Sequence, residues 1–490
     1  MRAVIRKALI FVHRWIGVAL CLLFVMWFTS AIVLMYWDFP SVGAEDRLER
    51  SPALNAENIR LSPAEAAARL DLDEPANQVR LNTFDGHPVY RFTTDRGERL
   101  VYADTGEEQV LVSPEMARRI ASAWTARPAA SAKQQFIEEP DQWTVQENLR
   151  DLMPLWKYSW PTGEQVYVSD ATGEVVQYTT SATRFWSYLG AIPHWLYFTP
   201  LRKHGAEWSR VVIWASGTGA ATAVLGIVIA IWMYSPAKRY RRSGQPASFP
   251  YHGQKRWHTI LGLIFGIGAV TWAFSGMLSM DPFPVAPESK PIDIPAALHG
   301  PLRLDAFESK SPREGLQELV GSPAKEIELT SLAGEPFYIA KLAPHKTRVL
   351  PVRGKSAAGF DPNRIINVVK TAISPAAIAD IRILNDYDFY YLDRHSELPL
   401  PVILIRLNDP DHSRYYIDPR TARIAGRYSS RRWVERWLYH GLHSLSFPWL
   451  YKYRPLWDIV VISFMLGGAA LSVTSLVLAW RVLKGKLERL

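Results

Sequence analysis

The sequence has a single cysteine, Cys21, among 490 residues. One thiol excludes an internal disulfide, a cysteine-rich zinc site and a four-cysteine iron–sulfur cluster. Cys21 stands inside a long apolar run, so we expect it to be a small packing residue. Any metal centre in this chain must therefore use other ligands.

Common nucleotide-binding and hydrolase motifs are also missing. The chain has no G-x-G-x-x-G after a strand, no Walker sequence, no G-x-S-x-G elbow and no H-E-x-x-H pair. Gly217 and Gly219 fall within an apolar run, where they favour helix packing. We therefore expect the chain to bind no flavin or nicotinamide of its own.

What the sequence does contain is four long apolar runs. These runs hold no Asp, Glu, Lys or Arg and cover residues 16–37, 211–234, 259–280 and 459–480. A helix needs roughly 20 apolar residues to cross a bilayer, so each run predicts a transmembrane helix. The first run is longer than the apolar core of a signal peptide and is followed by Asp38-Phe39-Pro40, so we expect it to stay in the protein.

Basic residues gather on one side of these runs. Residues 1–15 and 235–258 contain Lys and Arg without any acid, and residues 481–490 are also net basic, in a chain of formal net charge +9. The positive-inside rule therefore places both termini and the central connector in the cytoplasm. Membrane anchoring explains these clusters, and they give no reason to expect nucleic-acid binding.

The two long segments outside the cytoplasm, 38–210 and 281–458, have an α+β pattern. Ser62-Pro-Ala-Glu65 is a helix-capping box, and further helices are expected over 114–126, 313–320 and 362–373. Alternating residues predict strands around 78–81, 89–94, 100–102, 165–168, 326–339, 381–384, 402–407 and 413–417. Turns of the Asp-x-Thr-Gly type lack the further oxygens of a calcium loop, so plain hairpin turns are favoured.

Parts of the chain occur twice. Residues 192–214 align without a gap on 441–463, and residues 12–31 align on 257–276. The matched pairs include His194 with His443, His13 with His258, Gly17 with Gly262, Trp27 with Trp272 and Ser30 with Ser275. A tandem duplication therefore delivers histidines in pairs beside the predicted spans, and facing imidazoles are what a bis-histidine haem requires.

Several motifs resemble the PepSY-associated transmembrane family of bacterial iron-regulated membrane proteins. They are VHRWIG at 12–17, RFWSYLGAIPHWL at 184–196, RWHTILG at 256–262, RWLYHGLH at 436–443 and the Asp-x-Thr-Gly turns. The resemblance covers nearly the whole chain. It implies a four-transmembrane-helix bundle in the bacterial inner membrane, PepSY-like α+β domains in the periplasm, haem in the bundle and reduction of ferric siderophores.

The paired histidines are the candidate axial ligands of two haem b groups. His13 and His258 would hold one haem near the cytoplasm, with Gly17 and Gly262 four residues on, on the same helical faces. His194 and His443 would hold the second haem on the other side. His440, one helical turn before His443, is an alternative ligand, and the competing interpretation of all these histidines is that of polar interface residues. An interfacial aromatic belt explains most of the tryptophans and tyrosines near the outer pair without any cofactor.

A haem near each face predicts an oxidoreductase that passes electrons from the quinone pool or a cytoplasmic reductase to a ferric complex outside. The alternative is a non-catalytic, PepSY-type, membrane-anchored binding or regulatory protein. A transporter is disfavoured because the spans carry no charge and no break. The expected division is 1–37 (cytoplasmic N-terminus and first span), 38–210 (first periplasmic region), 211–234 (second span), 235–258 (basic connector), 259–280 (third span), 281–458 (second periplasmic region) and 459–490 (fourth span and tail).

Overall fold

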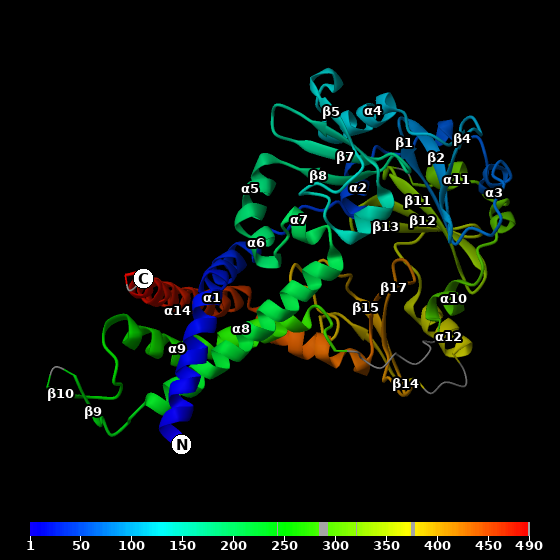
Figure 1. Cartoon of the computed structure of the whole chain (residues 1–490). Helices are drawn as coiled ribbons and strands as arrows, with labels where there is room; N and C mark the ends of the chain where they lie inside the picture. Colours follow the sequence, from blue (N-terminus) through cyan, green and yellow to red (C-terminus); the bar gives the residue numbers. More distant parts are fainter. Residues whose placement is uncertain (243, 284–292, 320, 374–377, 489–490) are drawn as a thin grey trace.

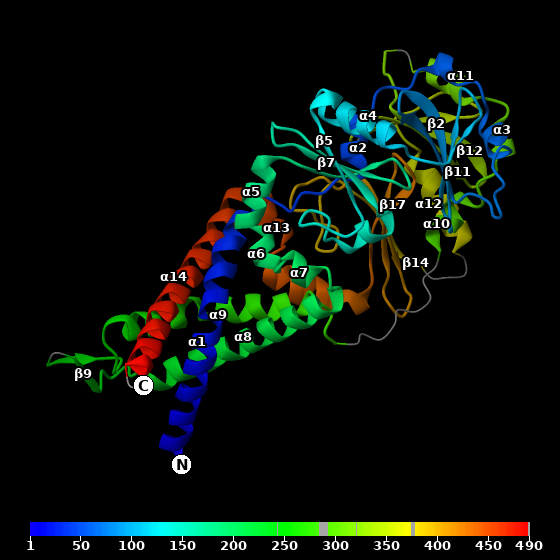
Figure 2. The ribbon, with the colours of Figure 1, turned by 45° about the horizontal axis from the view of Figure 1, so that its top comes forward.

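The computed structural model describes residues 1–242, 244–283, 293–319, 321–373 and 378–488. Long helices form one part of the molecule and β-sheets the other, and both termini lie at the far end of the helices (Figure 1, Figure 2). We call this end of the helical bundle the terminus side, and the end next to the sheets the domain side. Residues 284–292, within the second predicted periplasmic region, and Val320, at the end of a predicted helix, lie outside the described residues.

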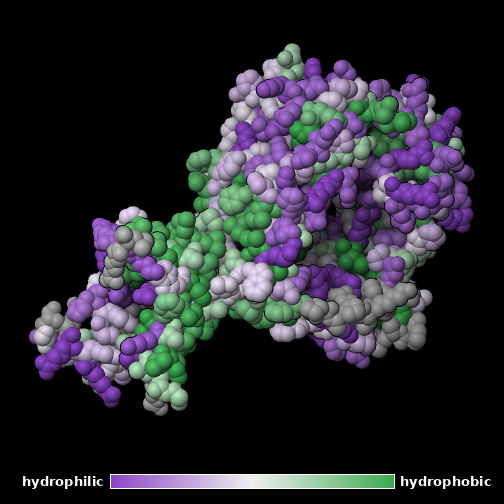
Figure 3. All heavy atoms as spheres, viewed as in Figure 1, coloured by the Kyte–Doolittle hydropathy of each residue, from purple (hydrophilic) through white to green (hydrophobic). Residues whose placement is uncertain are grey.

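Four helices of the described chain are long and apolar enough to cross a membrane. They are α1 (Arg2–Leu34), α8 (Gly205–Met233), α9 (Gly253–Leu278) and α14 (Arg454–Leu487). Hydrophobic residues cover much of their surface, whereas hydrophilic residues prevail over the sheets (Figure 3). These features fit a multi-pass membrane protein.

The helices are longer than the apolar runs that predict them. Helix α1 begins at Arg2, well before the run at 16–37, and α14 begins at Arg454. The reason is that hydropathy marks the part of a helix suited to hydrocarbon, whereas backbone hydrogen bonds continue through polar flanks. His13 and His258 therefore lie inside α1 and α9, within continuous helix.

A seven-stranded sheet joins the two predicted periplasmic regions. Its order is β13-β12-β11-β1-β2-β3-β4, and β1 pairs antiparallel with β11 through Val79 opposite Leu329. The strands are β1 (Gln78–Phe84), β2 (His87–Thr94), β3 (Gly97–Tyr102), β4 (Glu108–Gln109), β11 (Glu326–Leu332), β12 (Glu335–Ala343) and β13 (Lys346–Pro351). Segments 38–210 and 281–458 thus share one sheet.

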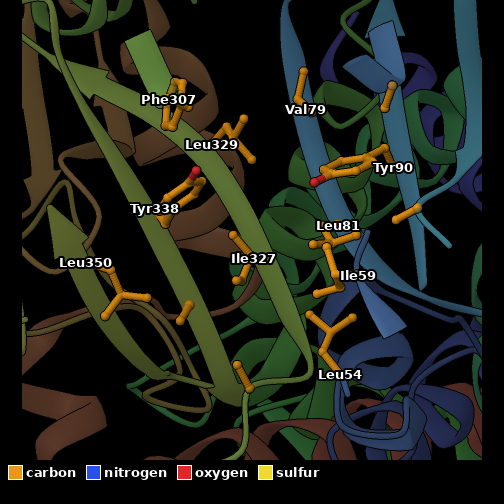
Figure 4. Close-up of a cluster of buried hydrophobic side chains, with 14 of the residues drawn as sticks. Leu54, Ile59, Val79, Leu81, Tyr90, Phe307, Ile327, Leu329, Tyr338 and Leu350 are labelled. Carbon is orange, nitrogen blue, oxygen red and sulfur yellow. The ribbon is translucent and has the colours of Figure 1, made fainter. Parts of the chain in front are cut away.

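The core of this sheet is built from both regions. Val79 and Leu81 of β1 are fully buried beside Ile327 and Leu329 of β11 (Figure 4). Burying such side chains contributes about 1.5–3 kcal/mol each, so the junction between the regions is a hydrophobic core. The two regions therefore support each other's folding.

Two smaller four-stranded sheets complete the domain part. One contains β5 (Lys133–Ile137), β6 (Leu155–Ser159), β7 (Gln165–Ser169) and β8 (Val175–Thr179). The other contains β14 (Ile378–Leu384), β15 (Val402–Leu407), β16 (Arg414–Asp418) and β17 (Arg423–Tyr428). With the helices α3 (Pro63–Ala67), α4 (Pro114–Thr125), α11 (Pro312–Gln317) and α12 (Pro362–Ala372), they agree with the α+β pattern of the sequence.

Short helices connect the sheets to the bundle. In the first region these are α5 (Ser181–Leu189), α6 (Ala191–Trp195) and α7 (Thr199–Arg202). In the second region a π-helix (Val434–Gly441) and α13 (Pro448–Lys452) precede α14. A hairpin of β9 (Tyr240–Arg242) and β10 (Gln245–Ala247) links α8 to α9 on the terminus side (Figure 1).

Candidate functional site

His13 and His258 face each other on the terminus side of the bundle. Their ring centroids are 6.2 Å apart. Nδ1 of His13 lies 3.0 Å from the carbonyl oxygen of Thr222 on α8, and a carbonyl can only accept a hydrogen bond. His13 therefore carries its hydrogen on Nδ1, which leaves the lone pair on Nε2.

The environment of His258 favours the same tautomer. Its Nδ1 lies 3.2 Å from the hydroxyl oxygen of Thr474 on α14. That hydroxyl donates its own hydrogen to the carbonyl of Leu471 at 2.6 Å. The oxygen is thus placed to accept the Nδ1 hydrogen, so Nε2 of His258 is also left as a ligand atom.

His194 and His443 form a second pair on the domain side. His194 belongs to α6 and His443 follows the π-helix, and their ring centroids are 6.1 Å apart. Nδ1 of His194 lies 3.3 Å from the hydroxyl oxygen of Ser30, and Nδ1 of His443 lies 3.0 Å from that of Ser275. Burial lowers the pKa of His194 to about 4 and that of His443 to about 3, so both rings are neutral at pH 7.

The spacing of both pairs fits two imidazoles on opposite sides of one metal ion. A metal–imidazole bond of about 2 Å, with the ring centre about 1.1 Å beyond the nitrogen, puts the centroids about 6.3 Å apart. A direct hydrogen bond between the rings would bring the centroids to about 5 Å. The observed 6.2 and 6.1 Å match the first arrangement.

The described residues contain no group of three or more His, Cys, Asp or Glu side chains able to hold a metal ion. A bare zinc ion needs three or four protein ligands, whereas haem iron takes four nitrogens from the porphyrin and one or two from the protein. Isolated histidine pairs therefore suit haem better than a free ion.

Each pair lines a cavity of the size expected for a cofactor. The terminus-side cavity has a volume of about 640 Å³ and is lined by His13, His258, Gly17 and Gly262. The domain-side cavity, of about 350 Å³, is lined by His194 and His443 together with several tryptophans. Ligand pockets in proteins usually measure about 300–1,000 Å³.

Glycines make room in the terminus-side cavity, as the sequence predicts for Gly17. A side-chain carbon added to Gly17 would have no described heavy atom within 4 Å, so the space beside it belongs to the cavity. Gly226 of α8, which the sequence does not single out, has a different role. A carbon added there would lie 2.8 Å from Cε1 of His13, so Gly226 allows the imidazole to lie against the helix.

The charged residues that line the two cavities, within the described chain, are all cations. Arg14, Lys255 and Arg481 line the terminus-side cavity, and Arg394 lines the domain-side cavity. Haem carries two propionate carboxylates, which are strong partners for Arg and Lys. The residues present therefore fit the charge of haem as well as its metal.

His440 does not join the domain-side pair. Its side chain is about half exposed, lies 4.0 Å from a carboxylate oxygen of Glu435 and is absent from the described lining of the cavity. The wider turns of the π-helix set the angle between His440 and His443, and His443 is the one that faces His194. Cys21 is buried and donates to the carbonyl of Val18 in its own helix, as a packing residue does.

Three residues line both cavities at once, namely Phe24, Phe28 and Ala269. The rings of Phe24 and Phe28 are stacked with centroids 6.2 Å apart, and Phe28 contacts Trp272 edge-to-face at 6.0 Å. Trp272 in turn donates to the carbonyl of His443 at 2.8 Å. Phe24 and Phe28, which line both cavities, thus form an aromatic partition between the two histidine pairs.

No model of a known protein family matches the chain, and no curated protein matches it. The functional proposal therefore rests on the residues, their geometry and the motif resemblance of the sequence.

Proposed function

We propose that the chain is a haem-containing oxidoreductase of the bacterial inner membrane, related to the PepSY-associated family, that reduces ferric siderophores on the periplasmic side. The observation that carries this proposal is the pair of facing histidines at each end of the bundle, with all four Nδ1 atoms engaged by oxygen. Such engagement leaves each Nε2 available as a ligand for a metal.

His13 and His258 would hold one haem b, and His194 and His443 the other. Cys21 lines the terminus-side cavity, but the sequence has no C-x-x-C-H motif, so both groups would be held by the histidines and by packing, without thioether bonds. Bound in this way, haem supplies reversible one-electron transfer, and ligation on both faces leaves no open position for oxygen.

The basic side chains orient the two groups. Arg14, Lys255 and Arg481 come from three different helices and all line the terminus-side cavity. They would hold propionates toward the terminus side, where the charges stay near water. Arg394 has the corresponding place on the domain side.

The two sites divide the thickness of the membrane between them. Ser30, the partner of His194, follows His13 by 17 residues along α1, which is about 26 Å of helix. Phe24 and Phe28 occupy the interval and line both cavities. The proposed electron path runs from the terminus-side pair through this partition to the domain-side pair.

The direction of transfer follows from charge. The basic flanks at 1–15, 235–258 and 481–490 favour a cytoplasmic position for the terminus side, where a quinone or a cytoplasmic reductase would supply electrons. The domain side then faces the periplasm, where the ferric complex is reduced.

Haem content tests this proposal directly. Protein purified from haem-replete cells is expected to be red, with two haems per chain and sharp reduced α and β bands. His13→Ala and His443→Ala should each lose one haem and keep the other, whereas His440→Ala, as a matched control, should keep both. Colourless wild-type protein would support the alternative of a non-catalytic binding protein.

The reductase activity needs a second measurement. Chemically reduced protein in liposomes is expected to be reoxidised by added ferric siderophore much faster than by buffer. Reoxidation at the buffer rate would remove the ferric siderophore as the acceptor while leaving the haem sites in place.

A further inference from the structure

Helix α5, which joins the sheet of β5 to β8 to α6 and His194, has an exposed apolar face. Phe185, Tyr188 and Leu189 are 56%, 55% and 47% exposed. Their spacing of three and four residues puts them on one side of the helix, whereas Ser187, on the other side, is fully buried. The helix thus packs through a serine, and the described chain leaves its large apolar side chains about half uncovered.

This helix lies at the domain-side end of α1 (Figure 1, Figure 2). The ring of Trp186 stacks on that of Trp37, just after α1, with centroids 4.0 Å apart. A side-chain carbon added to Gly190, which follows α5, would lie 2.9 Å from a methyl carbon of Val33. Val33 is four residues from the end of the apolar run at 16–37. Because that run predicts where the hydrocarbon ends, α5 is level with the boundary between hydrocarbon and headgroups.

The exposed side chains of α5 continue the apolar surface of the bundle. Trp37, which stacks on the helix, is itself 40% exposed. Hydrophobic residues extend from the long helices to the junction with the sheets (Figure 3). Amphipathic helices at a membrane surface bury their apolar face about 5–10 Å into the boundary between headgroups and acyl chains, and Tyr and Trp are enriched at that depth. The position and the composition of α5 both fit this environment.

The equivalent face in the second region is covered by protein. The alignment of 192–214 on 441–463, continued toward the N-terminus, places Tyr188 on Trp437 of the π-helix. The ring of Trp437 lies 6.0 Å from that of Phe389 and 5.9 Å from that of Tyr390, in the loop before β15. Tyr188 contacts the ring of Trp143 at 5.4 Å and still remains half exposed. The described chain therefore covers the face of the π-helix more fully than that of α5.

We propose that α5 docks on the domain-side surface of the bilayer, and that lipid covers Phe185, Tyr188 and Leu189. These side chains lie at the level of the glycerol groups and the first acyl carbons. Only Gly190 separates α5 from α6, so the docked helix also fixes the height of His194 relative to the membrane. This interaction surface is independent of haem and goes beyond the proposed function.

Fluorescence quenching at defined depths tests the proposal. Since Cys21 is the single cysteine, Cys21→Ala combined with Phe185→Cys leaves one site for an NBD label. The full chain is placed in lipid nanodiscs whose lipids carry a nitroxide at the fifth or at the twelfth acyl carbon, and emission is compared with that in nitroxide-free lipid. We expect blue-shifted emission that the shallow nitroxide quenches at least about twofold more strongly than the deep one.

Three further label positions serve as controls. Leu22→Cys, at a 67% exposed position of α1 inside the apolar run, should be quenched more strongly by the deep nitroxide. Phe136→Cys, at a 41% exposed position of β5, on the far edge of the sheet that leads into α5, should give water-like emission without quenching. Tyr188→Cys probes a second position of the same face and should repeat the result of Phe185→Cys, so that a folding defect of one variant does not decide the outcome.

The emission of the two α5 labels decides between the possible covers of this face. Water-like emission from both would overturn the proposal. Blue-shifted emission that neither nitroxide quenches would also overturn it, because a second copy of the chain or another protein would then cover the helix. Since each label is compared with itself in nitroxide-free lipid, the result holds whether or not the protein is the proposed reductase.

Discussion

Ser275 and His443 form one unit on the domain side of the bundle. The hydroxyl oxygen of Ser275 lies 3.0 Å from Nδ1 of His443, and the same hydroxyl donates to the carbonyl of Trp272 at 3.2 Å. Because its hydrogen is already given to Trp272, the serine oxygen accepts the hydrogen of Nδ1. Nε2 of His443 is then the unprotonated nitrogen, and the ring cannot rotate without losing this bond.

Removing this hydroxyl should loosen the proposed domain-side haem. We expect Ser275→Ala to weaken retention of one haem by about 10- to 100-fold, because hydrogen-bond partners of metal ligands typically have effects of this size. Haem content after washing with a haem-binding competitor, together with the reduction potential of the remaining haem, measures the effect. Thr271→Ala is the control, since among the described residues the Thr271 hydroxyl bonds within α9, to the carbonyl of Gly268. Equal haem loss in both variants would contradict the role of Ser275.

The open space beside Gly17 offers a test that does not touch a histidine. Gly17→Phe would fill part of the 640 Å³ cavity with an aromatic ring, in a place where the described residues leave room for it. The variant is expected to fold and to lose the terminus-side haem while it keeps the other. Gly485→Phe, on α14 and equally free of described neighbours within 4 Å, should keep both. Two haems in Gly17→Phe would show that the porphyrin does not lie there.

Much of the arrangement of the histidines was predictable from the sequence. The alignments match His13 with His258 and His194 with His443, and the structure brings each of these pairs together. The structure also contains the four apolar helices and the α+β pattern that the sequence predicts. The alignment also favours His443 over His440, and in the structure His443 is the histidine that lies opposite His194.

The partners of the histidines were harder to predict. Thr222 acts through its backbone carbonyl, which leaves no mark in the side-chain pattern. Continued along α8 and α14, the alignment of 192–214 on 441–463 places Thr222 on Leu471 and Gly226 on Ser475. The carbonyl of Leu471 accepts from Thr474, and the hydroxyl oxygen of Ser475 lies 3.3 Å from Nδ1 of His258. Extending the alignment along α8 and α14 would thus have pointed to these positions.

The sharing of one sheet by two distant regions was also beyond the sequence. Pairing of β1 with β11 joins residues about 250 positions apart, and alternation of apolar residues shows only that each is a strand. Edge strands of either region alone would expose unpaired backbone groups, and the pairing removes two such edges.

The domain part should lose stability in mild acid through His299. Burial lowers the pKa of His299, which donates from Nδ1 to the carbonyl of Ser331 at 2.6 Å. The pKa of His299 in the folded protein lies below the unfolded value of about 6.5. The contribution of the neutral imidazole to the free energy of unfolding is therefore complete above pH 6.5 and is lost as the pH falls below it. Thermal unfolding is followed by circular dichroism at pH 7.5 and 5.5. The difference in Tm between the two pH values should be smaller in His299→Gln than in the wild type. His395→Gln, at an exposed position, serves as control; an unchanged pH difference in His299→Gln would exclude this source.

The aromatic partition should affect the stability of the protein and the rate of electron transfer between the two proposed haems. Gly468 of α14 contacts the ring of Phe28 so closely that an added side-chain carbon would have to displace it. We expect Gly468→Ala to cost about 1–3 kcal/mol of unfolding free energy, as overpacking does, and to slow electron transfer between two fully retained haems. The control is Gly219→Ala at the equivalent position of α8, where the added carbon would lie 3.1 Å from the far edge of the Phe24 ring and a small shift relieves the contact. Thermal unfolding and stopped-flow reduction of the two haems from the terminus side measure the two effects. If Gly468→Ala has the stability and the electron-transfer rate of the wild type, Phe28 only fills space between the cavities and does not shape the electron path.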